Sequence, residues 1–379
     1  MIASEKLAEW LSRLVRIPSV TPAQAGPRAG VSGEATLAGK VAGWCRQLGA
    51  TVELEDVLPG RPSVYAIWRN QESDRWLALD VHIDTVGVET MEGDPFSGSI
   101  EDGRVYGRGA VDTKASLAVA LAMLEELKRT RQKLPCNLLL AATVDEEHSA
   151  TGAPALARWI TRRKLTIDEM IVAEPTMCAP VHGHKGVVRM AFDVKGRAAH
   201  SSNPSRGRNA ITAAAKLVLA MQKEADRLSR VRSPLGAPAL TVTLINGGTG
   251  LNVVPGQCSV SIDRRVVPGE SALTIARTLT RLAKQSIDLP VKVETSILID
   301  AFHNRAESPF VQRLSQWSRR APDVMPFCTN AWAYPKATKQ CVVLGPGSIA
   351  QAHAAVEWVE ISQLEKLSKI YAKWWGITP

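Results

Sequence analysis

The sequence predicts an α/β protein in which a larger, three-layer domain is interrupted by a smaller sheet-and-helix domain. Amphipathic helical patterns alternate with short apolar runs through the first half of the 379-residue chain, as in an open sheet covered by helices. A similar apolar run returns near the C-terminus, so both ends of the chain are expected to build one sheet. Between them the predicted elements follow the order βαββαβ, which is the ferredoxin-like pattern.

The larger domain is predicted from its helical periodicity and its apolar runs. Residues 4–15 form an expected helix with Ser4 as its N-cap. Further helices are expected at 34–48 and 114–128. Short runs rich in Val, Ile, Leu and Ala predict buried strands; these lie at 63–68, 77–83, 137–144, 170–173 and 341–344.

The smaller domain is expected to interrupt the larger one near residues 184 and 301. The larger domain then comprises residues 1–184 and 301–379, and the inserted domain residues 185–300. Its predicted elements are a strand at 187–194, a helix at 209–228, strands at 239–245 and 258–266, a helix at 273–284 and a strand at 291–298.

Composition narrows the possible classes of protein. The chain is 45% hydrophobic and has a net charge of +9, but its basic residues are dispersed and no nucleic-acid-binding signature occurs, so we expect no nucleic-acid partner. Attraction of small anionic substrates and a merely basic surface both remain open. The longest apolar run, 117–124, is far shorter than the roughly 20 residues that cross a bilayer, so we expect no membrane association. Six scattered cysteines without CxxC spacing fit reduced thiols and a cytoplasmic protein.

Histidine and carboxylate side chains follow the predicted strands. His82 and Asp84 lie on one face at the end of the strand at 77–83, where a carboxylate can fix the tautomer of a metal-bound imidazole. Asp112 lies in a glycine-broken loop at the start of the helix at 114–128. Taken alone, the first pair could be a polar strand end and Asp112 a helix cap.

Three further sites have the same position relative to a strand. The adjacent acids Asp145, Glu146 and Glu147 follow the strand at 137–144, and neighbouring carboxylates repel unless a cation or proton relieves them. Glu174 follows the strand at 170–173, and His353 follows the one at 341–344. Each could be an ordinary loop residue. Together, however, all candidates lie at or beyond the carboxyl ends of predicted strands, where open α/β sheets bind ligands.

The set matches the donor types of a catalytic two-metal site. Two histidines and three carboxylates, with one carboxylate shared, make two three-ligand sites that leave positions open for water and substrate.

At this point the sequence resembles a known family, the two-metal hydrolases that include acetylornithine deacetylase, succinyl-diaminopimelate desuccinylase, aminoacylase and carboxypeptidases. The resemblance covers nearly the whole chain. It implies a zinc-peptidase-like three-layer catalytic domain with an inserted ferredoxin-like lid and dimerisation domain. The motifs that carry it, in chain order, are His82-x-Asp84-x-Val86, Gly107-Arg108-Gly109-x-x-Asp112-x-Lys114, Asp145-Glu146-Glu147, Glu174-Pro175-Thr176, Lys185-Gly186, Ala199-His200-Ser201-Ser202-x-Pro204, Asn252-Val253-Val254-Pro255, Asp263-x-Arg265 and Gly345-Pro346-Gly347 leading to His353.

The resemblance implies a role for each candidate. Two divalent ions, zinc first and cobalt or manganese as alternatives, would share Asp112. His82 and Glu174 would complete one metal site, and Glu147 and His353 the other. Asp84 would orient His82. Glu146 would be the general base that takes a proton from the attacking water and passes it to the departing amine.

For the inserted domain the resemblance implies a homodimer formed through residues 185–300. His200 would reach into the neighbouring subunit's active site and support the oxyanion there. Asn252 and Arg265 would hold the substrate carboxylate, a task that suits the planar guanidinium of arginine. A polar turn and a surface ion pair are the alternatives for these two residues.

The expected activity is removal of an acyl group, with acetyl first, from an N-acyl amino acid such as N-acetylornithine. Residues 344–353 and Glu357 resemble acetylornithine deacetylases more than desuccinylases. Asn330, however, stands where relatives carry an acid, which weakens the case for a cationic ornithine tail, and Ala115 replaces a common glycine. Succinyl-diaminopimelate desuccinylase, dipeptidase or glutamate-type carboxypeptidase activity remains open, and so does a catalytically dead binding paralogue.

Overall fold

The computed structural model describes residues 2–31 and 33–377, and the chain divides into two compact units. The first unit holds the chain up to His182, the segment Asn304–Val324 and the chain from Thr329 onward. The second unit holds Gly183–His303 together with Met325–Cys328. The boundaries expected after residue 184 and before residue 301 fall close to these junctions, but the short segment Met325–Cys328 was not expected to join the second unit.

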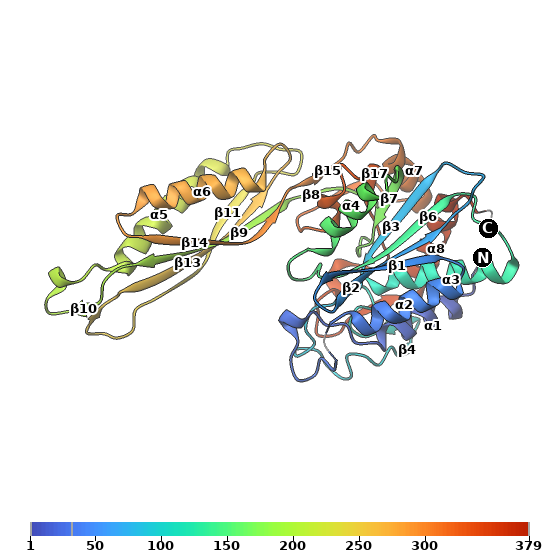
Figure 1. Cartoon of the computed structure of the whole chain (residues 1–379), viewed down its shortest axis with the longest axis horizontal. Helices are drawn as coiled ribbons and strands as arrows, with labels where there is room; N and C mark the ends of the chain where they lie inside the picture. The colour runs from blue at the N-terminus through green and yellow to red at the C-terminus, as the bar shows by residue number, and fades with distance from the viewer. Residues whose placement is uncertain (1, 32, 378–379) are drawn as a thin grey trace. The chain divides into compact units, whose positions relative to one another are not determined.

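The largest sheet is mixed, with the order β1-β2-β6-β3-β7-β17-β8-β15 and β16 paired to β8 (Figure 1). Its strands β1, β2, β6, β3, β7 and β17 form the centre of the first unit, whereas β15 lies in the second. The middle strands β6, β3, β7 and β17 run parallel to one another, and the strands toward both edges are antiparallel. The strands are β1 Thr51–Leu58, β2 Arg61–Trp68, β3 Trp76–His82, β6 Asn137–Thr143, β7 Ile167–Val172, β8 Val181–His184, β15 Phe302–His303, β16 Asp323–Met325 and β17 Thr338–Val343.

Helices cover both faces of this sheet. One face packs against α1 (Ser4–Val15), α2 (Ala35–Gln47), α3 (Lys114–Thr130), α7 (Pro309–Ser318) and α8 (Ile361–Trp375), which share one apolar core with β2, β3 and β6. On the other face α4 (Gly152–Arg162) places Trp159 with its ring centroid 4.8 Å from that of Tyr65 on β2. Every residue of β3 and β6 is buried, as expected of strands covered on both sides. The three-layer α/β class predicted from the sequence is confirmed.

Several elements differ from the sequence-based expectation. The N-cap of α1 is Ala3, so Ser4 does not cap the helix as expected; its hydroxyl instead donates to the Glu365 carboxylate on α8. Similarly, Thr113 and not Asp112 is the N-cap of α3. The elements β1, α4, α7 and α8 were not anticipated. Neither was a small separate sheet of β4 (Ile100–Glu101), β5 (Arg104–Tyr106) and β18 (Trp358–Glu360).

The second unit is a four-stranded antiparallel sheet with two helices. The strand order is β11-β13-β9-β14, which is the order that a ferredoxin-like βαββαβ chain produces. Alternate residues of β9, such as Val188 and Phe192, pack against the helices, while the residues between them, such as Arg189, lie on the opposite face. The elements are β9 Gly186–Lys195, α5 Ala210–Leu228, β11 Ala239–Gly247, β13 Gln257–Val266, α6 Ala272–Ser286 and β14 Val291–Ile299, with a small ribbon of β10 Ala199–His200 and β12 Val253–Val254.

Free thiols are present, as predicted, at Cys45, Cys136, Cys178, Cys258 and Cys341. No helix in the described part of the chain has the length and apolar character needed to cross a bilayer.

Candidate metal centre and active site

The parallel strands bring the candidate ligands to one edge of the sheet. His82 is the last residue of β3, and β6 and β7 run parallel to β3 on either side. The loop after β6 therefore delivers Glu146 and Glu147 to the same edge, and the loop after β7 delivers Glu174. His353 comes from the loop after β17, whereas Asp112 comes from the loop that leads into α3.

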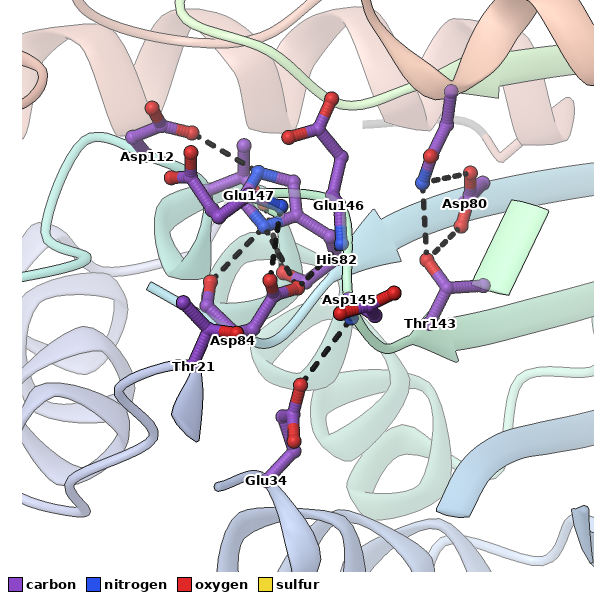
Figure 2. A network of polar contacts seen from close by, with 12 residues as sticks. Thr21, Glu34, Asp80, His82, Asp84, Asp112, Thr143, Asp145, Glu146 and Glu147 are labelled. Atoms are coloured by element: carbon purple, nitrogen blue, oxygen red, sulfur yellow. Dashed lines mark hydrogen bonds and ion pairs between the residues drawn. The ribbon is translucent and has the colours of Figure 1, made fainter. Parts of the chain in front are cut away.

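Two overlapping triads result. His82, Asp112 and Glu174 place one ligand atom each within 4.8 Å of one another, and so do Asp112, Glu147 and His353. The two Asp112 oxygens face different histidines, since Oδ1 lies 3.0 Å from His82 Nε2 and Oδ2 lies 3.3 Å from His353 Nε2. His353 Nε2 also lies 3.1 Å from Glu147 Oε1. Figure 2 shows His82 between Asp84 and Asp112, with Glu146 and Glu147 beside it.

The charge balance of this cluster fits bound cations. Four carboxylates gather here, from Asp112, Glu146, Glu147 and Glu174. Among the ion pairs of the described residues, none joins any of these four to an arginine or lysine; their recorded partners are His82 and His353. Burial raises the pKa of Glu146 and of Glu174 well above the usual range of a carboxyl group. Buried acids without fixed cations, next to two imidazoles, are a suitable donor set for two divalent ions of the zinc type.

The neighbouring acids raise the pKa of both histidines. Hydrogen bonds to Asp112 and Glu147 raise the pKa of His353 to about 10. The pKa of His82 is raised well above its usual value because hydrogen bonds with Asp112 and Asp84 outweigh the opposing effect of burial. The imidazolium charge thus stabilises the same carboxylates that would otherwise hold metal.

Asp84 connects two parts of the centre. Its Oδ1 lies 3.6 Å from His82 Nδ1, and that nitrogen is closer, at 3.0 Å, to the Asp84 backbone oxygen. The carboxylate accepts the backbone N–H groups of Glu146 and Glu147 at 3.1 and 3.0 Å. Asp84 therefore holds the loop that carries both glutamates, in addition to its contact with His82.

A buried ion pair positions the loop that carries Asp112. Arg108 Nη1 donates to Glu357 Oε2 at 2.6 Å, and both side chains are almost fully buried. The other oxygen, Glu357 Oε1, accepts the backbone N–H groups of Val111 and Asp112 at 3.0 and 3.2 Å. The sequence singled out Glu357 only because it follows a segment that resembles the family. In the structure its carboxylate holds the backbone of the loop that carries Asp112.

The first acid of the triplet faces away from the metal cluster. Asp145 Oδ1 accepts from Arg61 Nη1 at 2.9 Å, and Asp145 Oδ2 accepts from the Thr151 hydroxyl at 2.6 Å. Arg61 Nε also donates to Glu34 Oε2 at 2.7 Å, and Glu34 Oε1 accepts the Asp145 backbone N–H (Figure 2). The triplet therefore divides into one residue that anchors the loop and two that point into the centre.

Asn330 is buried in the first unit, with 2% of its surface exposed. Its Nδ2 donates to Asp80 Oδ2 at 3.1 Å and to the Thr143 hydroxyl at 3.2 Å. Asp80 also accepts from Thr143 at 2.7 Å and from the Tyr334 hydroxyl at 2.6 Å. The side chain of Asn330 is thus part of a buried polar network, and the effect of its amide on recognition of an ornithine tail stays a prediction. Ala115, the other departure, is fully buried in the core that α3 shares with the sheet.

The three candidates of the second unit lie at two different places in it. His200 on β10 pairs with Val253 on β12, and the Ser201 N–H donates to the Asn252 backbone oxygen at 2.9 Å, so His200 and Asn252 are neighbours. His200 Nδ1 accepts the Ser202 N–H at 3.2 Å and lies 2.6 Å from the Ser202 hydroxyl. Arg265 lies near the other end of β13 and donates through Nε to Asp263 Oδ1 at 2.8 Å.

Sequence reasoning missed Asp80, Arg61, Glu34 and the partner of Glu357. One signal for Asp80 was present, since it is a lone acid inside the apolar run 77–83, two residues before His82 and so on the same face. The other contacts join residues far apart along the chain, and no local pattern marks them.

Comparison with known proteins agrees with this geometry. Residues 78–376 match the peptidase family M20/M25/M40. The acetylornithine deacetylase of Vibrio campbellii is 31% identical over 347 residues, which cover 88% of this chain and 89% of that one. Among solved structures, an M20 family metallo-carboxypeptidase from Sulfolobus solfataricus has a TM-score of 0.81 at 19% identity, covering 98% of this chain and 99% of that chain. A tripeptidase from Staphylococcus aureus has a TM-score of 0.77 at 21% identity, covering 98% and 97%.

The fold, the candidate metal centre and these relatives together define a hydrolase that acts on amide bonds. The chain belongs to the peptidase family M20/M25/M40.

Proposed function

We propose that this protein is a metal-dependent deacylase of N-acyl amino acids in the cytoplasm, with N-acetylornithine or a close analogue as substrate. The observation that carries the proposal is the pair of overlapping triads sharing Asp112, with Glu146 beside them. Curated relatives at 31% identity that are named acetylornithine deacetylases support the choice of an acetylated amino acid. The free thiols of Cys45, Cys136, Cys178, Cys258 and Cys341 support a reducing compartment.

Two ions would be held by the two triads. His82, Asp112 and Glu174 would hold one, and Asp112, Glu147 and His353 the other. Zinc suits this mixture of imidazole and carboxylate ligands, and cobalt or manganese could take its place. When bound, the two ions would polarise the amide carbonyl. They would also lower the pKa of a bound water molecule to near neutrality.

Glu146 moves the proton in this proposal. Its carboxylate accepts a proton from the water that attacks the amide carbon, and then donates the proton to the departing amine nitrogen. Burial, which raises the pKa of Glu146, makes the protonated form accessible at the second step. The backbone contact from the Glu146 N–H to Asp84 fixes the position of the residue.

His200 and Asn252 are proposed to act on a neighbouring subunit's substrate. The eight-residue step along β13 from Gln257 to Arg265 spans about 26 Å. His200 and Asn252 lie beyond the Gln257 end, whereas Arg265 is paired with Val187, close to where the chain enters the unit. One chain therefore cannot place His200 and Arg265 on the same N-acyl amino acid, but two chains of a symmetric dimer can.

The second unit offers a surface for such a dimer. Strand β11 is an edge strand, and Leu244 and Ile245 on it are 61% and 50% exposed. Leu219 on the neighbouring helix α5 is 63% exposed. Contiguous exposed apolar side chains beside an unpaired strand edge are typical of a protein interface.

Peptidase activity is the second candidate, because solved relatives of the same fold are named as carboxypeptidase and tripeptidase. Both activities cut an amide with the same machinery and differ in the acyl side of the substrate. The presence of both sets of metal-ligand types together with Glu146 argues against a dead binding paralogue.

The test combines elemental analysis with a substrate panel. We expect up to two divalent ions per chain, loss of activity on exhaustive chelation, and faster hydrolysis of N-acetyl amino acids than of dipeptides. The carboxyl-amidated form of the best substrate serves as the matched control and should be much poorer. Full activity in protein shown to be free of metal contradicts the mechanism, and an amidated substrate that is cut equally well contradicts the role of Arg265.

A further inference from the structure

Two arginines on the open face of the second unit share one carboxylate. Arg189 of β9 lies directly opposite Asp263 of β13, and Arg265 lies two residues farther along β13 on the same face. Arg189 Nε lies 3.0 Å from Asp263 Oδ2, and Arg265 Nε lies 2.8 Å from Asp263 Oδ1. Asp263 thus keeps two like charges side by side.

The single carboxylate of Asp263 does not neutralise both guanidinium groups, and it does not occupy all of their N–H donors. Two guanidinium groups face one carboxylate, so the group of three carries a net positive charge. Arg265 reaches Asp263 a second time through Nη2 at 3.5 Å. For Arg189, the only side-chain hydrogen bond recorded within the described residues is the one from Nε, so its two Nη groups remain available to an acceptor from outside the chain. Half of the Arg189 side chain is exposed.

A hollow of about 520 Å³ lies on the same face. Arg189 and Asp263 line it together with the hydroxyl side chains of Thr243, Ser261, Thr295 and Ser296. The acid on its rim, Glu294, is paired with Lys292 and so does not cancel the charge of Arg189. Met190, Ala191, Leu244 and Ile262 also line the hollow, so its surface is mainly apolar, and Arg189 supplies its positive charge.

We propose that Arg189 forms a second carboxylate-binding site beside Arg265, so that the protein prefers substrates with two carboxylates. The inference rests on the proposed function, in which Arg265 holds the first carboxylate of an N-acyl amino acid. It refines that function, because the positive charge of Arg189 favours a dicarboxylic substrate over the cationic side chain of ornithine. The second carboxylate could be on the amino acid side chain or on the acyl group, and both present the same anion.

Four substrates separate these cases: N-acetylalanine with one carboxylate, N-acetylglutamate, N-succinylalanine and N-acetylornithine. We expect the metal-loaded wild-type protein to cleave at least one dicarboxylic substrate with a higher kcat/KM than N-acetylalanine, and N-acetylornithine with a lower one. Whichever of N-acetylglutamate and N-succinylalanine is better shows where the second carboxylate lies.

The variant Arg189→Gln should lower the ratio of kcat/KM for the dicarboxylic substrate to kcat/KM for N-acetylalanine at least about tenfold, chiefly through KM. Arg189→Lys keeps the charge but loses the planar guanidinium group. Its kcat/KM ratio should therefore lie between those of the wild type and Arg189→Gln. Arg281→Gln is the matched control, since it removes an exposed arginine from α6, on the opposite face of the sheet. A ratio that is unchanged in Arg189→Gln, or that falls equally in Arg281→Gln, overturns the proposal.

A binding measurement keeps the proposal independent of catalysis. Glutarate should bind the full-length, metal-loaded protein more tightly than butyrate by calorimetry, and Arg189→Gln should remove most of that difference. If no amide is hydrolysed but glutarate shows this dependence on Arg189, the proposed function fails and the anion site stands. If amides are hydrolysed but glutarate and butyrate bind alike, the anion site is wrong and the hydrolase stands.

Discussion

Asp112 contacts more of the candidate metal centre than its neighbours do. Its two oxygens contact two histidines that come from distant parts of the chain, and its backbone N–H is fixed by Glu357. Glu146 and Glu147 are adjacent in sequence, yet only Glu147 contacts a histidine. Identical side chains at neighbouring positions can therefore serve different purposes, because the loop after β6 directs them differently.

This division of labour predicts different outcomes for two isosteric substitutions. Glu146→Gln should lower kcat at least about 10²-fold while leaving metal content and folding nearly intact, because it removes a proton carrier and leaves every ligand in place. Glu147→Gln is the matched comparison and should lower metal occupancy. Steady-state kinetics with elemental analysis measure both effects. Normal turnover in Glu146→Gln means that another group is the base, and full occupancy in Glu147→Gln removes Glu147 from the ligand set.

Metal binding is expected to release protons. In the metal-free protein the pKa of His353 is raised to about 10 by hydrogen bonds to Asp112 and Glu147, and burial raises the pKa of Glu174 well above its usual range. Ligands must be deprotonated to bind an ion, so these groups lose protons on binding and the apparent affinity rises with pH. Calorimetric titration with zinc in buffers of different ionisation enthalpy, between pH 6 and 8, counts the protons. Proton-neutral binding would exclude these residues as ligands.

At the scale of elements, the parallel strands β3, β6 and β7 make the centre possible because they end at one edge. The polar network of Asp80, Thr143, Asn330 and Tyr334 joins two of these strands to the segment before β17. Asp80 is fully buried and lies two residues before His82. Buried polar networks of this kind are favourable only when each member has a partner, so a change in one member affects the whole.

Asn330→Asp tests this network. The substitution places a second carboxyl group against Asp80 where the Nδ2 donor stood, and we expect it to lower the free energy of unfolding by about 3 kcal/mol. The double variant Asp80→Asn with Asn330→Asp exchanges donor and acceptor, and should recover part of the loss. Urea unfolding monitored by tryptophan fluorescence measures both. If Asn330→Asp is as stable as the wild type, the hydrogen bond from Asn330 to Asp80 does not stabilise the fold and this account of the network is wrong.

At the scale of the whole molecule, His200 and Arg265 lie at opposite ends of the second unit, and the proposed roles of both residues then call for a partner chain. The long antiparallel pair β9 and β13 separates them rigidly, because every residue from Gly186 to Lys195 is paired with β13. In the proposed function, a substrate held by Arg265 would be reached by a His200 only from another copy.

Mixing two inactive variants tests this requirement. One chain carries Glu146→Gln and the other His200→Ala, and each homodimer is expected to be inactive. In a mixed dimer, the site on the His200→Ala chain keeps its own Glu146 and receives an intact His200, so one site is rebuilt. With random exchange, about a quarter of wild-type activity should return. Recovery near zero, after mass spectrometry has verified mixed dimers, places His200 in its own subunit's site or removes it from catalysis.

The sequence by itself predicted the α/β class, the main buried strands and the identity of the metal-centre candidates. These follow from local patterns: apolar runs mark β3, β6, β7 and β17, and polar residues directly after such runs lie at the sheet edge. The edge strand β1 was missed because it carries acids such as Glu53 and Glu55 on exposed or half-buried positions and lacks an apolar run. The ligand, general-base and substrate-binding roles stay predictions.

Only the tertiary structure decided which polar residues support the centre and which belong to it. Asp145 and Glu146 are indistinguishable in sequence pattern, and only the contact of Arg61 with Asp145 separates the anchor from the proposed base. The burial of Asn330 beside Asp80 likewise is evident only in the folded chain. The register between β9 and β13 decides that Arg189 lies opposite Asp263, and that Arg265 lies at the end of β13 away from Gln257. Such contacts join residues that are distant along the chain, and their partners are chosen by packing and charge in the folded state, which no local pattern encodes.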